Sequence, residues 1–355
     1  MKDITVEELY QLDHPAIIDI RSPVEFKDGA IPGAINIPLF TDDERKEIGT
    51  IYKQVGQDAA KWKAMQFVSP KIPDLLQSIK DATAHSGEQP IIHCWRGGMR
   101  SKAVVTFLDF AGIRAKRLAG GYKAYRQYIL QEIRHLLPER AIVLHGLTGV
   151  GKTEILKLLN GMGYPVLDLE EMAAHRGSIF GTIGIGNGHN QKTFDSLLHK
   201  RLREIQGSSY FLMEAESKRI GKATQPEELM TKKINGIHIY LHTSMEARVK
   251  HIANEYIYPY EHDPWYYNEI KQSLERIFPR MKDVETKTRL QEYLESREYT
   301  KMIKILLEDY YDPKYDHKRQ DYIGEFIDIY AESHQEAAEK VAKHLEALSI
   351  KPQSV

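Results

Sequence analysis

The sequence has little that would tie it to an oxidising compartment or to a membrane. Its 355 residues include one cysteine, which excludes an intramolecular disulfide, a paired-cysteine redox motif and a thiolate metal cluster within one chain. No apolar run approaches the roughly 18 residues that a membrane-spanning helix needs. The first ten residues also lack the apolar core of a secretory signal. We therefore expect a cytoplasmic protein that has no membrane partner.

The sequence also lacks a strong charge of either sign. The formal net charge is −1, so no global basic field favours nucleic acid, and any polyanionic partner must bind a local basic face. Hydrophobic residues make up 42% of the chain, which is enough for well-packed cores. The length suits two domains rather than one.

Short β-branched runs alternate with longer helical patterns, which is typical of an α/β fold. One run, Ile91–Cys94, ends in a glycine-rich loop, and the pattern restarts at Ala141–His145 after a proline. We predict an N-terminal α/β domain over residues 1–128 and a connecting helix or linker over 129–139. A parallel-sheet α/β domain follows over residues 140–355.

A complete phosphate-binding motif opens the second domain. Residues 146–153 read Gly-Leu-Thr-Gly-Val-Gly-Lys-Thr, which satisfies G-x-x-x-x-G-K-[ST] between a predicted strand and a predicted helix. Inward-facing N–H groups and the helix N-terminus bind phosphate oxygens, the lysine adds a full positive charge, and the threonine suits Mg²⁺. The motif recognises phosphates and no base, so a nucleoside triphosphate and another diphosphate both remain open. The predicted phosphate-binding residues are Gly146, Thr148, Gly149, Gly151, Lys152 and Thr153.

Three acidic residues and one arginine lie near the motif in the predicted sheet. Asp168 ends one strand, while Glu214 and Glu216 end another, where carboxylates hold Mg²⁺, support its ligands, or simply keep the strand end soluble. Arg176 belongs to a glycine-dense stretch that we interpret as a loop closing over the ligand. In that case Arg176 clamps an anion, and the alternative is an ordinary surface loop.

The single cysteine lies between a strand and a helix, in the run His93–Ser101. Backbone N–H groups, the helix dipole and Arg100 are all expected to lower the pKa of the Cys94 thiol there. Arg96 lowers the pKa of this thiol further if its side chain turns toward the loop. We predict that Cys94 is a nucleophile and that Arg100 and Arg96 assist it.

The stretches Asp19–Phe26, Gly29–Pro38 and Leu118–Ala124 resemble the rhodanese domain, which carries sulfur on a cysteine. Five residues separate Cys94 from Arg100, whereas sulfur-carrying rhodaneses usually have four. Five is the spacing of tyrosine and dual-specificity phosphatases, and the larger loop better fits a tetrahedral phosphate-like group. An alternative is therefore a Cys-x5-Arg phosphatase fused to a kinase-like P-loop domain, although the sequence identifies no general acid. A non-enzymatic binding module would not need the intact loop.

The whole chain resembles the tRNA 2-selenouridine synthase family, in which a rhodanese-like domain is fused to a P-loop domain. This resemblance implies a transferase that replaces the sulfur of wobble 2-thiouridine with selenium from selenophosphate. It also implies an S-geranyl-2-thiouridine intermediate that is made from geranyl diphosphate. The resemblance rests on the two loops and on further stretches at 47–54, 168–170, 175–178, 214–221 and 308–313.

The same resemblance sets the expected partners and cofactors. We expect no tightly bound cofactor, Mg²⁺ at the P-loop, a tRNA anticodon stem-loop as substrate, and a selenophosphate-producing enzyme as partner. Two positions depart from the family pattern: Ala64 stands where glycine is usual, and Ala215 where aspartate is usual. Basic residues near the end of the first domain are candidates for binding tRNA phosphates. They are Arg114, Lys116, Arg117, Lys123 and Arg126.

Overall fold

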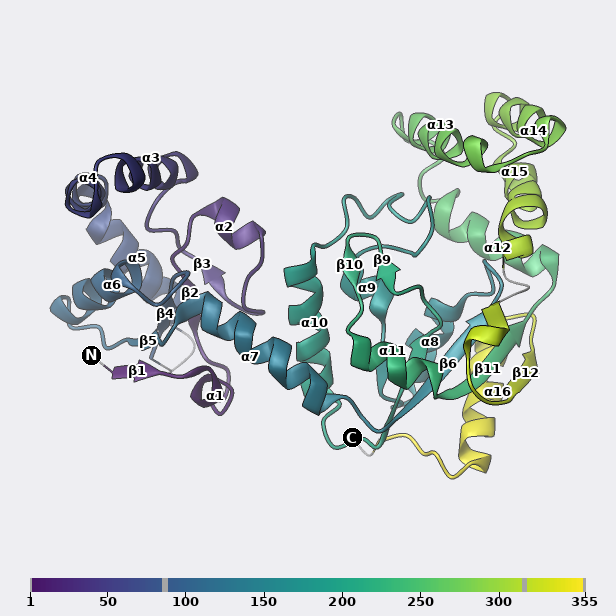
Figure 1. Cartoon of the computed structure of the whole chain (residues 1–355), viewed down its shortest axis with the longest axis horizontal. Coiled ribbons are helices and arrows are strands. Elements are labelled where there is room, and N and C mark those ends of the chain that lie inside the picture. The colour runs from purple at the N-terminus through teal and green to yellow at the C-terminus, as the bar shows by residue number, and fades with distance from the viewer. Residues whose placement is uncertain (1, 85–88, 315–317, 354–355) are drawn as a thin grey trace. The chain divides into compact units, whose positions relative to one another are not determined.

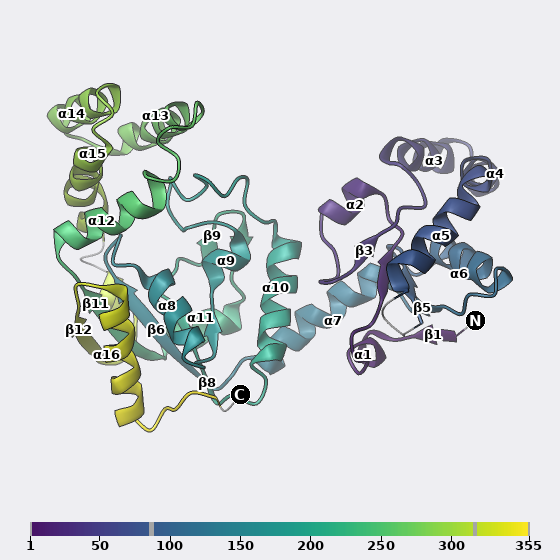
Figure 2. The ribbon, with the colours of Figure 1, turned by 180° about the vertical axis from the view of Figure 1, so that it is seen from behind.

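The computed structural model describes residues 2–84, 89–314 and 318–353, and the chain divides into two compact units (Figures 1 and 2). The first unit comprises Met1–His135 with Asp195–Lys200, and the second comprises Leu136–Phe194 with Arg201–Val355. Each unit contains one five-stranded sheet in which every neighbouring pair is parallel, so the predicted α/β fold is confirmed. Within the described ranges, no helix combines the length and apolar character that crossing a membrane requires.

The sheet of the first unit has the strand order β1-β5-β4-β2-β3. Its central strand β4 consists of three fully buried residues, as expected where helices cover both faces of a parallel sheet. The five strands are β1 (Lys2–Ile4), β2 (Ile17–Asp19), β3 (Ile35–Asn36), β4 (Ile91–His93) and β5 (Lys116–Leu118).

The helices of the first unit differ in how much they bury. The last one, α7, buries residues at a helical spacing, among them Tyr122, Tyr125 and Ile129, so one face of it belongs to the core. By contrast, α3 has no buried residue at all. The helices are α1 (Val6–Leu9), α2 (Pro23–Lys27), α3 (Asp42–Gln54), α4 (Gln57–Val68), α5 (Ile72–Thr83), α6 (Met99–Phe110) and α7 (Gly121–Leu136).

A buried ion pair lies at the carboxyl end of β2. Asp19 and Arg21 are 0% and 1% exposed, and their closest side-chain atoms, Oδ2 and Nη2, are 2.6 Å apart. The guanidinium also donates to the Gly29 carbonyl oxygen at 2.7 Å and lies over the Tyr122 ring. This network ties the strand end to the loop after α2.

The sheet of the second unit has the order β12-β11-β6-β8-β7. This order places β6 next to β8, with Leu144 paired with Glu214, so the carboxyl ends of these two strands are neighbours. The strands are β6 (Arg140–Gly146), β7 (Val166–Leu167), β8 (Tyr210–Glu214), β11 (Ile237–His242) and β12 (Phe326–Tyr330). A separate antiparallel pair is formed by β9 (Arg219–Ile220) and β10 (Ala223–Thr224).

The helices of the second unit form two groups with separate cores. Helices α8 and α16 contribute to the core against the sheet, whereas α12, α13, α14 and α15 enclose a second apolar core at one edge of this unit (Figures 1 and 2). The helices are α8 (Lys152–Gly161), α9 (Leu169–Ala173), α11 (Glu227–Ile234), α12 (Met245–Tyr256), α13 (Tyr266–Ile277), α14 (Val284–Glu295), α15 (Tyr299–Leu306) and α16 (His334–Ala347). Helix α10 (Gln191–Glu204) is shared, because its middle residues Asp195–Lys200 belong to the first unit.

The Arg21→Met substitution is expected to destabilise the first unit by about 3–5 kcal/mol, because it leaves the buried Asp19 carboxylate without its cation. Urea unfolding followed by circular dichroism measures this loss. The matched control is Arg117→Met, which removes the more exposed ion pair with Asp3 and is expected to cost less than about 1 kcal/mol. Equal effects of the two substitutions would contradict the structural role of the buried pair.

Candidate functional site

The phosphate-binding loop of the second unit joins β6 to α8, as the sequence predicts. Gly149 and Gly151 have φ values of +87° and +80°, which side-chain-bearing residues rarely adopt. A Cβ atom at Gly151 would lie 2.0 Å from Nε2 of His334, so a larger residue there would also displace this imidazole ring. Gly151 is the N-cap of α8 and offers no side-chain cap, which leaves the first N–H groups of the helix for an anion.

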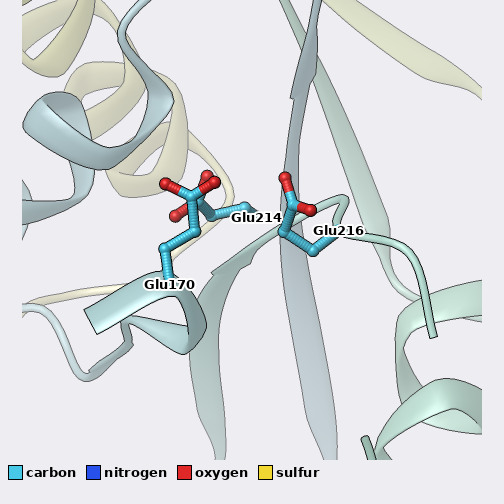
Figure 3. A group of neighbouring side chains, drawn as sticks. All are labelled: Glu170, Glu214 and Glu216. Atoms are coloured by element: carbon cyan, nitrogen blue, oxygen red, sulfur yellow. The ribbon is translucent and has the colours of Figure 1, made fainter. Parts of the chain in front are cut away.

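Three carboxylates gather beside this loop, and Figure 3 shows them pointing toward one another. Glu170, Glu214 and Glu216 each place an oxygen within 4.8 Å of the others. The Thr153 hydroxyl donates to this cluster, with Oγ1 2.9 Å from Glu170 and 3.2 Å from Glu214. The cluster therefore forms because adjacent strands β6 and β8 bring the loop and the strand-end glutamates to one edge of the sheet.

Negative charge in this cluster is poorly compensated by the surrounding side chains. Burial, followed by the charge of Glu216, raises the pKa of Glu170 to about 8, although Lys152 opposes the shift. Burial and the charges of Glu170 and Glu216 likewise raise the pKa of Glu214 well above its usual range. A hydroxyl and several carboxylate oxygens are the ligands that Mg²⁺ prefers, so the residues present fit a divalent cation.

The sequence pointed to two members of this cluster and missed the third. Asp168 is not in it: its side chain caps α9 by accepting from the Glu171 N–H at 2.9 Å. Glu170, the second residue of α9, turns its carboxylate to the P-loop threonine instead. The sequence signals for Glu170 were its place in a short acidic stretch at the end of a strand and in the family-like stretch 168–170, and both signals applied equally to Asp168.

A cavity of about 550 Å³ extends from the P-loop into the helical part of the second unit. One side is polar and carries Gly149, Gly151, Lys152, Thr153 and the three glutamates. The remainder combines polar groups, such as His251 and Asn254, with an apolar part, because the core enclosed by α12–α15 opens toward the loop. Its apolar lining includes Ile183, Ile252, Ile257, Ile270, Met302, Ile303, Leu306 and Leu307. The cavity therefore suits a ligand with an anionic head and an apolar body.

Two arginines of this unit are held by carboxylates. Arg176 lines the cavity as predicted, but its Nε lies 2.6 Å from Glu255 and its Nη1 donates to the Ile183 carbonyl, so its charge is already balanced in this arrangement. Arg248 is buried, donates through Nε to the Thr148 carbonyl at 2.8 Å and pairs with Asp312. Sequence reasoning did not single out Arg248, which braces the P-loop backbone from α12.

In the first unit, Cys94 directly follows β4 and begins the loop that leads into α6. Its side chain is 3% exposed, and its Sγ lies 3.4 Å from the Ser101 hydroxyl. Arg100 donates to Glu25 through Nη1 at 2.7 Å, and this pair orients the guanidinium beside the loop. Gly98 caps α6 without a side-chain hydrogen bond, so this helix also begins with N–H groups directed toward the loop.

The environment of Cys94 favours the thiolate. Burial by itself raises the pKa of the thiol, but the Ser101 hydroxyl, the charge of Arg100 and the backbone N–H groups of Ser101 and Gly98 outweigh it. The pKa of Cys94 is therefore lowered from its ordinary value. The neighbouring His93 is fully buried, and burial lowers its pKa to about 4, so it adds no positive charge near neutral pH.

Arg96 and the basic residues that we predicted to bind tRNA lie at or near the surface of the first unit. Arg96 is exposed and lines a cleft next to Cys94. Among the basic residues proposed for tRNA, Arg117 pairs with Asp3, and Arg126 lies 2.6 Å from the buried carboxylate of Asp195. Arg114 and Lys123 are exposed. Contact of this group with tRNA stays a prediction.

Each unit of the chain matches the model of a known protein family. Residues 5–128 match the model of the rhodanese-like domain, and residues 139–348 match that of the tRNA 2-selenouridine synthase AAA domain. A tRNA 2-selenouridine synthase of Pseudomonas putida (strain F1) is 34% identical over 336 residues, covering 87% of this chain and 89% of that protein. One of Hahella chejuensis is 32% identical, covering 86% and 85%.

A third relative, the tRNA 2-selenouridine synthase of Pseudomonas syringae pv. syringae, is 38% identical over 252 residues, which are 69% of this chain and 67% of that protein. The similarity to the first two relatives spans both units, including the Cys94 loop and the P-loop. The suspected resemblance is therefore confirmed, and the chain belongs to the tRNA 2-selenouridine synthase family.

Proposed function

We propose that this protein acts on tRNA and replaces the sulfur of a 2-thiouridine with selenium in two steps, one in each unit. The second unit alkylates the sulfur with geranyl diphosphate, and the first unit exchanges the alkylated sulfur for selenium. The observation that carries this proposal is the cavity of the second unit, in which a P-loop adjoins a wall with eight isoleucine, leucine and methionine side chains. The names of the relatives support the tRNA substrate and the selenium.

In the first step, the 2-thiouridine sulfur attacks the first carbon of the geranyl group. A C–S bond forms, the C–O bond to the diphosphate breaks, and the uridine loses its N3 proton. Lys152 and the N–H groups at the start of α8 stabilise the negative charge that develops on the departing diphosphate. Mg²⁺ held by Glu170, Glu214 and Glu216 would supply further positive charge at the diphosphate.

A nucleoside triphosphate is the usual ligand of such a loop, and the cavity favours geranyl diphosphate over it. Beyond the P-loop the wall combines eight isoleucine, leucine and methionine side chains with tyrosines and with polar groups such as His251 and Asn254. The aliphatic side chains offer a geranyl chain an apolar surface that gives the ring nitrogens of a purine base no partner. An isoprenoid chain buries apolar surface against such a wall without leaving polar atoms unpaired.

In the second step, Cys94 acts on selenophosphate. Its loop has the five-residue spacing that fits a tetrahedral anion, and the Arg100–Glu25 pair places a guanidinium beside it. The thiolate attacks phosphorus: an S–P bond forms, the P–Se bond breaks, and selenium leaves with the bonding pair as hydrogen selenide. Water then hydrolyses the phosphocysteine and restores the thiolate and phosphate.

Attack on phosphorus balances without any electron donor. Transfer of selenium onto the Cys94 sulfur would instead leave phosphorus two electrons richer, as phosphite. Selenide is a weakly basic leaving group and needs no general acid. The described residues that line the cleft beside Cys94 include two carboxyl groups, Glu25 and Asp42. Glu25 accepts from Arg100 and Asp42 accepts from the Val24 N–H, so a mechanism without a general acid suits this site.

Hydrogen selenide then adds to C2 of the S-geranylated base. The C–Se bond forms, the C–S bond breaks, the selenide proton moves to N3, and geranylthiolate carries away the negative charge. Alkylation in the first step is what makes this exchange feasible, because a thiocarbonyl sulfur without the alkyl group does not leave readily.

Geranyl diphosphate is expected to bind the full chain more tightly than ATP, and Lys152→Ala should weaken that binding by about 10- to 100-fold because it removes a charge-assisted contact. Isothermal titration calorimetry with both ligands measures this. The matched control is Lys157→Ala, which removes an exposed lysine of the same helix that pairs with Glu154. Tight ATP binding without geranyl diphosphate binding would defeat the assignment of the P-loop.

Cys94→Ser is expected to abolish selenation while the first step continues, since the two reactions use different loops. Incubation with a 2-thiouridine stem-loop, geranyl diphosphate and selenophosphate should therefore accumulate S-geranyl-2-thiouridine, which nucleoside mass spectrometry detects. Formation of 2-selenouridine by this variant would rule out the role of Cys94.

Alkylation of Cys94 by iodoacetamide is expected to have its pH midpoint below about 8.5, the ordinary thiol value, because the folded loop favours the thiolate. Ser101→Ala should raise the midpoint by roughly 0.5–1 pH unit, since a hydrogen bond to the thiolate is lost. The single cysteine makes the mass-spectrometric signal unambiguous. Thr106→Ala, an exposed change on α6, is the control, and an equal shift in both variants would contradict the assigned contact.

A further inference from the structure

A cleft of about 1220 Å³ opens beside Cys94 in the first unit. It lies between the Cys94 loop, the start of α6, and the helical pair α3 and α4. Its interior is mainly apolar, and the loop of the reactive thiol forms one end of it. The apolar lining includes Leu39, Phe40, Ile48, Ala60, Ala64, Met65, Val68, Met99, Ala103 and Phe107.

The cleft explains why two helices of this unit bury so little. None of the 13 residues of α3 is buried, and α4 buries only Ala60 and Val68. Met65 and Met99 remain 47% and 55% exposed on the cleft wall. Methionine is unbranched and adapts its shape to what it contacts, so these side chains suit a flexible apolar ligand. An apolar surface of this extent next to a reaction centre indicates a binding function.

The edge of the same cleft is basic. Arg45, Lys46, Lys53, Lys61 and Arg96 all line it, whereas the lining acids are Glu25 and Asp42. Of these bases, Arg45 pairs with Glu25 and Lys61 with Asp58. A basic edge around an apolar interior complements an RNA that carries an apolar group, because phosphates contact the edge while the group enters the interior.

We propose that this cleft binds the geranyl chain of S-geranyl-2-thiouridine in the tRNA, and so selects the alkylated intermediate for selenation. The inference rests on the proposed function, since that function supplies the alkylated substrate. The sulfur that leaves must lie beside the Cys94 loop at the moment when selenium enters. Its alkyl chain therefore has to occupy the space that adjoins this loop, and that space is the apolar cleft.

This binding site gives the selenation step a recognition element that its chemistry requires. A 2-thiouridine without the alkyl group gains nothing from the cleft, so a base that cannot react does not compete with the alkylated base for the site. Geranylthiolate is released into an apolar environment, which holds the alkyl part while the C–S bond breaks. A partner protein in the same place would cover Cys94, which argues for the substrate as occupant.

The test supplies the intermediate ready-made, so that it does not depend on the first step. Full-length protein is mixed with selenophosphate and an anticodon stem-loop that carries either S-geranyl- or S-methyl-2-thiouridine, and 2-selenouridine is measured under single-turnover conditions at limiting RNA. The S-geranyl RNA is expected to react at least about tenfold faster, since burial of only a few extra methylene groups produces such a factor. Equal rates for the two RNAs would overturn the inference.

Two variants locate the effect in the cleft. Ala64→Phe fills the wall of α4, and Met65→Gln makes an exposed position of that wall polar without a large change of volume. Each is expected to lower the S-geranyl rate about three- to tenfold and leave the S-methyl rate within about twofold. Gln66→Phe, an exposed change on the same helix outside the cleft, is the control for a larger side chain.

The outcomes separate this inference from the proposed function. If the S-geranyl rate is unchanged in both cleft variants while the wild type makes S-geranyl RNA from geranyl diphosphate, the cleft proposal fails and the proposed first step stands. If the wild type makes no S-geranyl RNA but converts the supplied S-geranyl RNA in preference to S-methyl RNA, the cleft proposal stands and the assignment of the P-loop fails.

Discussion

Both candidate sites are built on the start of a helix whose first N–H groups have no side-chain cap, an arrangement that attracts anions. Helices α6 and α8 each follow a central parallel strand, and they begin at Gly98 and Gly151 without a side-chain cap. Other helices of the chain, such as α3 and α16, are capped by the side chains of Thr41 and Ser333. Because the first N–H groups of a helix need acceptors, the start of α6 suits the Cys94 thiolate, and the start of α8 suits the phosphate that the P-loop motif predicts.

The apolar surroundings of the two loops extend this common design. The P-loop opens into a cavity enclosed by α12–α15, and the Cys94 loop opens into the cleft formed with α3 and α4. An anionic centre beside an apolar pocket suits a ligand that combines a charged and a hydrocarbon part. The two ligands that we propose, a prenyl diphosphate and a prenylated nucleotide, are both of this kind.

Carboxylates orient the arginines that support these loops. Glu25 holds Arg100 beside the Cys94 loop, and Asp312 holds Arg248 against the Thr148 carbonyl. Each pair restricts a long side chain before any ligand arrives, so less conformational entropy is lost on binding. The three glutamates at the P-loop differ from these pairs, because no arginine among the described residues balances their charge. Their mutual repulsion, together with burial, favours a cation between them.

The sequence by itself determined the two loops, the α/β class and the order of the units, because each of these rests on residues that are neighbours in the chain. A glycine with positive φ, the lysine after Gly151 and the cysteine after β4 act through local backbone geometry, which a short stretch specifies. Only the tertiary structure decided that Glu170, and not Asp168, faces Thr153, and that Ile183 and Met302 line one cavity with Lys152. These residues meet through strand order and helix packing, and no spacing along the chain encodes such contacts.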